Sequence, residues 1–369
     1  MKRSKKIAVN VFRVILSLGF LWFAYSLIRF DDQIEVRHGT EIVKAQSVEE
    51  RGESYIVTLS DTETRTLPKE GTTITNQPGF LTLFNQMNKT LFFFLIPFCL
   101  IPFLLLSLRW WVLLRATKFE VSIRESFLIN YIGLFFNNFL PGNVGGDVAR
   151  GLIVARGADR KTALIGTILL DRLIGLGAMI LLATVCVLPF YRDPSMRLSL
   201  YIILGLFFGM IFSYLVYFNQ TLRGLFQGKG EKGRIRQIFS DLDGAFLLVK
   251  EQKRVVVISL LLSLFGQSGM IILTYGLAVA LEVKEASLIQ FFVFEPIIFM
   301  ITAVPISMGG WGIQEGAYAF FFGKAGVPVN GAVAISILFK LTLIFVSIPG
   351  GILLALGVGR RRNESGSDT

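Results

Sequence analysis

The stretch NNFLPGNVGGDVARG, residues 137–151, decides how the rest of the chain is interpreted. It combines asparagines, glycines, a proline, an aspartate and an arginine, and it lies between two apolar runs. Irregular backbone is tolerated at membrane depth only where protein buries it or where it lines a wet cavity. We therefore predict that this stretch is the turn of a re-entrant helical hairpin, which enters the membrane and returns to the same side.

The composition indicates a membrane protein. Hydrophobic residues make up 53% of the 369 residues and charged residues 17%, whereas soluble domains average about 45–50% and about 25%. Runs such as TLFFFLIPFCLIPFLLLSL (90–108) and LIGLGAMILLATVCVLPF (173–190) approach the length of about 20 residues that a spanning helix needs. We predict an all-α polytopic membrane protein with about six full spans, at 8–29, 89–108, 162–188, 198–218, 255–280 and 331–357.

A second glycine-rich stretch, PISMGGWGIQEG (305–316), also follows an apolar run. We predict two oppositely oriented re-entrant hairpins, one over 123–160 from the cytoplasm and one over 288–330 from outside. Such a pair implies an inverted repeat, as in many transporters. The alternative is a set of ordinary spans joined by glycine-rich interfacial loops.

The segment 31–87 interrupts the apolar pattern. It is polar, and short runs rich in Val, Ile and Thr are separated by Gly, Asp and Ser, a pattern typical of short strands and tight turns. We predict a small β-rich extracytoplasmic insert. The predicted domains are a first transmembrane helix (1–30, retained rather than cleaved as a signal peptide), this insert (31–87), the transmembrane domain (88–359) and a cytoplasmic tail (360–369).

The net charge of +11 comes from basic residues at the ends of apolar segments, which is typical of cytoplasmic anchors rather than of a nucleic-acid surface. We expect Arg109 and Arg115 to be such anchors and 219–254 to contain an amphipathic helix on the cytoplasmic surface. The prediction is therefore a multi-pass protein of the cytoplasmic (inner) membrane with both termini in the cytoplasm and no nucleic-acid partner.

The first glycine-rich stretch has features of an anion site. Gly145 and Gly146 expose the backbone, and Asp147 can cap a new helix whose N–H groups face an anion. Arg150 can bind a phosphate bidentately. A plain helix cap for Asp147 and a snorkelling side chain for Arg150 stay open as alternatives.

Charged residues within apolar runs are costly, so they usually face the bundle interior or a water-filled cavity. Asp171 and Arg172 are of this kind, with a structural ion pair between helices as the alternative. Glu315 is another, and Lys340 is a candidate partner for it unless it snorkels. We expect the AFFF run (319–322) to contact lipid. The predicted substrate-binding residues are Asn137, Asn138, Asn143, Gly145, Gly146, Asp147, Arg150, Asp171, Arg172, Gly309, Gly310, Gln314, Glu315 and Lys340.

No catalytic machinery is recognisable in the sequence. The single histidine, His38, stands alone in the insert, and neither a nucleotide-binding loop nor a metal-ligand cluster is evident. We predict no cofactor and no catalytic residues, although paired carboxylates leave a membrane-embedded lipid-modifying enzyme open. A membrane scaffold that presents 31–87 to an envelope protein is a further alternative, and a homo-oligomer stays open.

Three motifs carry a family resemblance: FFNNFLPGNVGGDVARGLIVAR, DRLIGL and PISMGGWGIQEGAYAFFF. In this order over about 88–357 they resemble the transmembrane region of lysylphosphatidylglycerol synthases, a flippase-like domain shared with archaeal proteins of dolichol-phosphate-linked glycosylation. The resemblance implies that the chain moves modified lipids between leaflets. It points to Pro141, Gly142, Gly145, Gly146, Asp147, Arg150, Asp171, Arg172, Gly309, Gly310, Gly312 and Glu315.

The chain departs from that family in two respects. A short polar tail follows Arg362, where the synthases carry a soluble transferase domain, so the synthase activity is not transferred. The insert 31–87 is additional. The resulting prediction is a flippase or translocase for a phospholipid or a polyprenyl-phosphate-linked lipid, whose partner is a membrane lipid with a phosphate head group.

Overall fold

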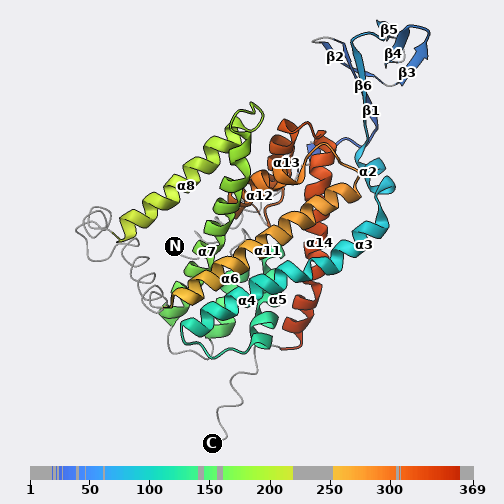
Figure 1. Ribbon diagram of the computed structural model, residues 1–369. Helices are drawn as coiled ribbons and strands as arrows, with labels where there is room; N and C mark the ends of the chain where they lie inside the picture. Colours follow the sequence, from blue (N-terminus) through green and yellow to red (C-terminus); the bar gives the residue numbers. More distant parts are fainter. Residues whose placement is uncertain are drawn as a thin grey trace, which may run out of the picture.

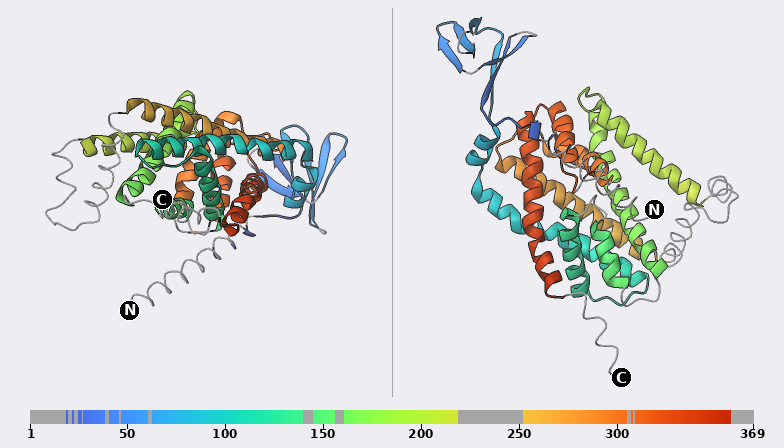
Figure 2. Two further views of the ribbon diagram at one scale, coloured as in Figure 1. Left: turned by 90° about the horizontal axis from the view of Figure 1, so that it is seen from below. Right: turned by 180° about the vertical axis from the view of Figure 1, so that it is seen from behind.

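The computed structural model describes residues 28–38, 41–45, 47–60, 63–139, 145–155, 161–218, 252–304, 307 and 309–357, together with Gly19, Trp22, Tyr25 and Ser26. Helices form a bundle from which a small β unit projects (Figure 1), and Figure 2 shows the same projection from behind. The predicted first span (8–29), the surface helix within 219–254 and the tail 360–369 lie wholly or mostly outside the described residues.

The β unit consists of two three-stranded antiparallel sheets, with strand orders β2-β1-β6 and β3-β4-β5. Its small core contains Val36, Ala45 and Val57. Apolar and polar residues alternate in β1, so that Ile34 and Val36 share one face of the sheet. The strands are β1 (Gln33–His38), β2 (Glu41–Ala45), β3 (Ser47–Arg51), β4 (Ser54–Ser60), β5 (Glu63–Pro68) and β6 (Thr72–Gln77). Short strands therefore lie within the predicted insert (31–87), between Gln33 and Gln77, and residues Phe80–Gln86 near its end form the helix α2.

Among the described residues, four helical segments are long and apolar enough to cross a membrane: Lys89–Ala116, Ala163–Phe190, Lys253–Ala280 and Val329–Ala355. The first combines α3 (Lys89–Phe98) and α4 (Leu100–Ala116). Shorter apolar helices cover Arg197–Ser213 and Leu288–Ala303. The chain is thus a mainly helical, multi-pass membrane protein. The remaining elements of this series are α2 (Phe80–Gln86), α7 (Lys161–Val187), η1 (Leu188–Phe190), α8 (Arg197–Phe218), α11 (Lys253–Ala280) and α14 (Val329–Ala355).

Helix α11 crosses the bundle and packs against α3, α4, α7, α12 (Leu288–Ala303) and α14 (Figure 1). Small residues allow its close approach to the α3–α4 segment. A Cβ at Gly269 would meet the ring of Pro102 at 2.9 Å, and one at Gly276 would meet Leu95 at 2.8 Å. Small residues at helix interfaces are typical of membrane bundles, where backbones approach closely.

Two shorter helix pairs flank the two glycine-rich stretches. Helix α5 (Ile123–Phe139) packs against α6 (Gly145–Ala155), and α12 (Leu288–Ala303) packs against α13 (Ile313–Lys324). The α5–α6 pair lies in the lower half of the bundle in Figure 1 and the α12–α13 pair in the upper half, on the side of the β unit. The two predicted hairpins require helix–turn–helix pairs of this kind.

Helix α14 packs against both pairs, through α5 and through α13. The contact with α5 is so close that a Cβ at Gly350 would clash with the backbone carbonyl of Tyr131. Helix α14 therefore holds the two pairs in a common framework.

Candidate functional site

Asp147 lies at the centre of a cluster of charged side chains. It is in the first turn of α6, and its two carboxylate oxygens accept hydrogen bonds from Arg150 on the same helix and Arg172 on α7. Its side chain is 9% exposed, and that of Arg172 is 33% exposed. The carboxylate therefore orients two guanidinium groups.

A second carboxylate extends the cluster. Asp171 accepts a hydrogen bond of 2.7 Å from Nε of Arg109 on α4, and its other oxygen lies 3.7 Å from a guanidinium nitrogen of Arg150. Arg109 also donates to Ser263 Oγ on α11 at 2.9 Å. The expectation that Arg109 is an interfacial anchor is wrong: the residue is 8% exposed because its side chain turns into the bundle toward Asp171. Arg115, one and a half turns on, is exposed.

Polar and aromatic groups of α4 and α5 hold Arg150 in place. A guanidinium nitrogen donates to Asn130 Oδ1 at 2.6 Å, and the guanidinium carbon lies 4.7 Å from the ring centroid of Trp110. The backbone of α5 also passes close by, since a Cβ at Gly133 would lie 2.9 Å from Cγ of Arg150. Arg150 therefore does not snorkel toward an interface; its side chain is held by contacts with three other helices, α4, α5 and α7.

We call this group the arginine cluster. It comprises Arg109, Arg150, Arg172, Asp147 and Asp171, so three guanidinium groups face two carboxylates. Burying charge in a medium of low dielectric constant is costly unless partners compensate it. By formal charge the five residues carry an excess of one positive charge, and this excess favours an anion.

A second charged pair lies in the other half of the bundle. Lys340 on α14 donates to Glu315 on α13 at 2.8 Å, and the two side chains are 7% and 0% exposed. The other oxygen of Glu315 accepts the backbone N–H of Gly312 at 2.6 Å, and the ammonium lies 4.4 Å from the ring centroid of Trp311. The proposed partnership of Lys340 with Glu315 is thus present, and snorkelling of Lys340 is ruled out.

The two charged groups occupy corresponding positions. Asp147 and Arg172 are 25 residues apart, and so are Glu315 and Lys340. The shift in numbering that carries Asp147 to Glu315 also carries α7 (Lys161–Val187) to α14 (Val329–Ala355), and both helices are 27 residues long. In each half, an acidic residue in the first turn of a short helix pairs with a basic residue on the next long helix.

The two halves meet where the short helices end. Asn138 near the end of α5 donates to Ser347 Oγ on α14 at 3.0 Å, and its backbone oxygen would lie 3.0 Å from a Cβ placed on Gly309. Gly309 has a φ of 56°, a conformation that glycine adopts without strain. The second glycine-rich turn therefore lies against the C-terminal end of α5.

The other predicted site residues are placed as follows. Asn137 accepts the backbone N–H of Gly146 at 2.6 Å, which fixes the start of α6 and leaves Gly145 buried beside it. Gly310 lies in the second glycine-rich turn and Gln314 in the first turn of α13, and Gly310 O accepts the backbone N–H of Gln314 at 3.0 Å. Asn143, like Pro141 and Gly142, lies outside the described residues.

A partly buried carboxylate that is not among the predicted site residues lies near the second charged pair. Glu295 on α12 accepts a hydrogen bond from the hydroxyl of Tyr318 on α13. The signal was available, because Glu295 interrupts the run FFVFEPIIFM in the way that Asp171 interrupts its own apolar run. Tyr318 is fully buried within the same helix pair as Glu315.

The AFFF run does not behave as expected. Phe320 is exposed, but Phe321 and Phe322 are buried against α12, where Phe322 packs edge-on against Phe294 at 5.2 Å between ring centroids. Because a helix presents neighbouring residues on different faces, only part of such a run can face lipid.

Residues 75–350 match the profile of a protein family described as the lysylphosphatidylglycerol synthase TM region. The UPF0104 membrane protein of Methanocaldococcus jannaschii is 24% identical to this chain over 224 residues, which cover 60% of this chain and 93% of that protein. No solved structure matches the chain. The matched region contains both helix pairs and both charged groups, and it begins within the last strand of the β unit.

Proposed function

This chain belongs to the lysylphosphatidylglycerol synthase transmembrane-region family, and we propose that it is a flippase that moves a lipid with a phosphate head group between the leaflets of the cytoplasmic membrane. The substrate class is a phospholipid or a polyprenyl-phosphate-linked lipid. The proposal is carried by one observation: the arginine cluster brings an excess of positive charge into an apolar helical bundle.

The proposed membrane arrangement has six full spans and two oppositely oriented re-entrant hairpins. The opposite placement of the α5–α6 and α12–α13 pairs in Figure 1 supports it, as does the correspondence between Asp147–Arg172 and Glu315–Lys340. In this arrangement the β unit is extracytoplasmic and both termini are cytoplasmic. The basic residues at the ends of the apolar segments agree with this orientation.

The proposed binding step exchanges one anion for another. Arg150 and Arg172 share the carboxylate of Asp147, which orients both guanidinium groups in the absence of lipid. A phosphate presents more acceptor oxygens than a carboxylate and suits bidentate binding by arginine. A head group that enters beside the partly exposed Arg172 would be bound by both guanidinium groups, and Asp147 would then take an ammonium group or a proton.

The test is lipid scrambling in vesicles that contain the purified full-length chain. A fluorescent phospholipid in the outer leaflet is quenched by dithionite, so the quenched fraction reports movement between leaflets. We expect Arg150→Ala to reduce the rate at least about tenfold, the scale of one lost charge-assisted contact. The matched control is Arg115→Ala, because Arg115 lies at the exposed end of α4.

Arg150→Lys separates charge from geometry, because a lysine keeps the positive charge and loses the bidentate fork. We expect an intermediate rate for that variant. A wild-type rate for Arg150→Ala, in a protein with the same melting temperature as the Arg115→Ala control, would refute the proposal.

A further inference from the structure

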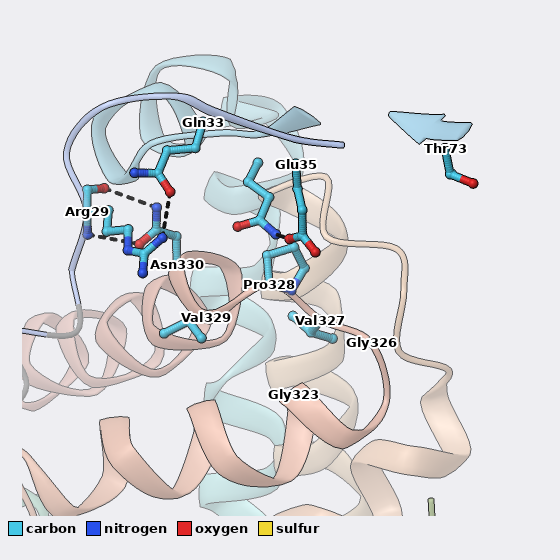
Figure 3. Close-up of a pocket in the computed structure, with 11 residues that line it drawn as sticks. Arg29, Gln33, Glu35, Thr73, Gly323, Gly326, Val327, Pro328, Val329 and Asn330 are labelled. Carbon is cyan, nitrogen blue, oxygen red and sulfur yellow. Dashed lines mark hydrogen bonds between the residues drawn. The ribbon is translucent and has the colours of Figure 1, made fainter. Parts of the chain in front are cut away.

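The described residues form a second polar site at the foot of the β unit. A cavity of about 620 Å³ lies between the β1–β6 ladder and the turn that joins α13 to α14 (Figure 3). This volume is within the range of about 300–1,000 Å³ that is common for small-molecule sites. Side chains from three separate segments line it: Arg29 before the β unit, Gln33, Glu35, Thr73 and Gln77 in its strands, and Asn330 on α14.

The framework of the cavity is held by Asn330, which is 8% exposed. Its carbonyl oxygen accepts the backbone N–H of Arg29 at 3.0 Å, and its amide donates to the backbone oxygens of Arg29 and Pro78 at 3.1 Å each. One side chain of the bundle therefore fixes both ends of the insert. These three hydrogen bonds join the insert to α14 at the edge of the cavity.

The cavity is lined by two charged groups, the cationic Arg29 and the anionic Glu35, which lie in different parts of it. Figure 3 shows Arg29 and Gln33 on one side of Pro328 and Glu35 on the other. Arg29 donates to Gln33, and Glu35 accepts from the amide of Gln77. A guanidinium group has five N–H donors, and a carboxylate accepts several hydrogen bonds. Each group can therefore bind a ligand atom in addition to the partners that it already has. A ligand with separate anionic and cationic ends matches this arrangement.

Aromatic residues near Arg29 indicate how deep in the membrane the cavity lies. Trp22, Tyr25 and Phe30 precede or follow Arg29 and have exposed fractions of 72%, 60% and 42%. Trp and Tyr gather at the level of the lipid head groups, where an amphipathic ring meets both water and hydrocarbon. The cavity therefore lies at head-group level, where a membrane lipid can reach it from the side.

We propose that this cavity binds the head group of a zwitterionic phospholipid that carries a phosphate and a primary ammonium group. Arg29 binds the phosphate, Glu35 binds the ammonium, and the amides of Gln33 and Gln77 orient both. The site is separate from the arginine cluster and does not depend on lipid movement. It gives the insert, most of which lies outside the matched family region, a role in lipid recognition.

The test is native mass spectrometry of the full-length chain in detergent, titrated with phosphatidylethanolamine and with phosphatidylglycerol. We expect the wild type to bind the ethanolamine lipid about tenfold more tightly, because only that head group pairs with both charges. Glu35→Gln is expected to remove this preference, and Arg29→Gln to weaken both lipids. Soluble glycerophosphoethanolamine is expected to compete with the ethanolamine lipid.

The matched controls are Glu63→Gln and Arg65→Gln, the same two changes at an exposed ion pair on β5. Equal binding of the two lipids by the wild type would overturn the proposal, and so would a preference that survives Glu35→Gln. Failure of glycerophosphoethanolamine to compete would also overturn it, because acyl chains alone would then hold the lipid. Arg150→Ala protein serves to separate the two proposals: it loses scrambling if the flippase proposal holds, and it keeps the lipid preference if the cavity proposal holds.

Discussion

Lys340 and Glu315 form an ion pair of 2.8 Å that is almost completely sealed inside the bundle. The pair joins α13 to α14, so it ties the second helix pair to the helix that also packs along the first. The Lys340 ammonium lies over the ring of Trp311, and the Glu315 carboxylate also accepts the backbone N–H of Gly312 at the start of α13. The first prediction follows from the cost of leaving either charge without the other.

We predict that Lys340→Met lowers the free energy of unfolding by about 3–5 kcal/mol, because it leaves the Glu315 carboxylate buried without its cation. Adding Glu315→Gln to Lys340→Met is expected to recover much of the loss. Thermal unfolding of the full-length chain in detergent measures both. Lys324→Met, at an exposed lysine on α13, is the control. A double variant no more stable than the single one would contradict the interpretation.

The close packing of α14 on α5 gives a second prediction. Gly350→Ala places a methyl group against the backbone carbonyl of Tyr131, and we expect a loss of about 1–3 kcal/mol, as for other overpacked interiors. Gly205→Ala on α8 is the matched control, since a Cβ there meets nothing within 4 Å. It is expected to be neutral or to stabilise by up to about 1 kcal/mol, the helix propensity difference. Equal melting temperatures for the two variants would be inconsistent with the packing described.

The third prediction concerns the partly buried carboxylate of Glu295. Tyr318→Phe removes its hydroxyl donor and is expected to cost about 1–3 kcal/mol, the penalty for an unsatisfied buried polar group. Tyr275→Phe on the neighbouring α11 is the control, because Tyr275 contacts Phe291 through its ring. Combining Tyr318→Phe with Glu295→Leu is expected to restore stability. If the combined variant melts as low as Tyr318→Phe, the hydrogen bond is not the cause.

The fourth prediction concerns pH at the root of the β unit. Asp32 accepts the backbone N–H of Gly79 at 2.5 Å, and this bond and one from Thr82 lower the pKa of the Asp32 carboxyl from its ordinary value of 3.8. A carboxyl with a lowered pKa stabilises the folded state above the ordinary value and loses that contribution as the pH falls through the lowered one. The junction is therefore expected to weaken only below about pH 4.

Carbon-13 NMR of aspartate-labelled protein measures this titration. We expect Asp32 to titrate below 3.8 and Thr82→Ala to move its pKa upward, because one of the two bonds to the carboxylate is lost. Thr64→Ala on the distant strand β5 should leave the titration unchanged. An Asp32 carboxyl that titrates at or above 3.8 in the wild type would show that the bonds are not made.

The sequence predicted a multi-pass membrane protein with two glycine-rich helix pairs, because both features depend on composition over long stretches of the chain. Apolar length identifies spans, and glycine-rich interruptions identify the turns of the two helix pairs. It also assigned Asp147, Arg150, Asp171 and Arg172 to one polar site, and the structure does bring them together. A charge inside an apolar run needs a partner wherever its helix lies, so this inference does not depend on the packing.

The sequence could not predict whether a charged side chain near the end of a helix points into the bundle or toward the membrane surface. Arg109 lies in the last two turns of α4, where snorkelling and burial give the same local pattern, and only the position of Asp171 on another helix decides between them. The same limit applies to Phe321 and Phe322, whose burial depends on where α12 lies. Pairing between distant helices is a property of the assembled bundle.

The chain leaves the helical bundle for the β unit and returns to it at almost the same point. Phe80 N–H donates to the backbone oxygen of Arg29 at 2.9 Å, and Asn330 contacts the backbone on both sides of the excursion. A module joined through two such adjacent ends can be exchanged, lengthened or removed without moving the helices that carry it. The head-group preference of the chain can in this way evolve in the module while the arginine cluster stays as it is.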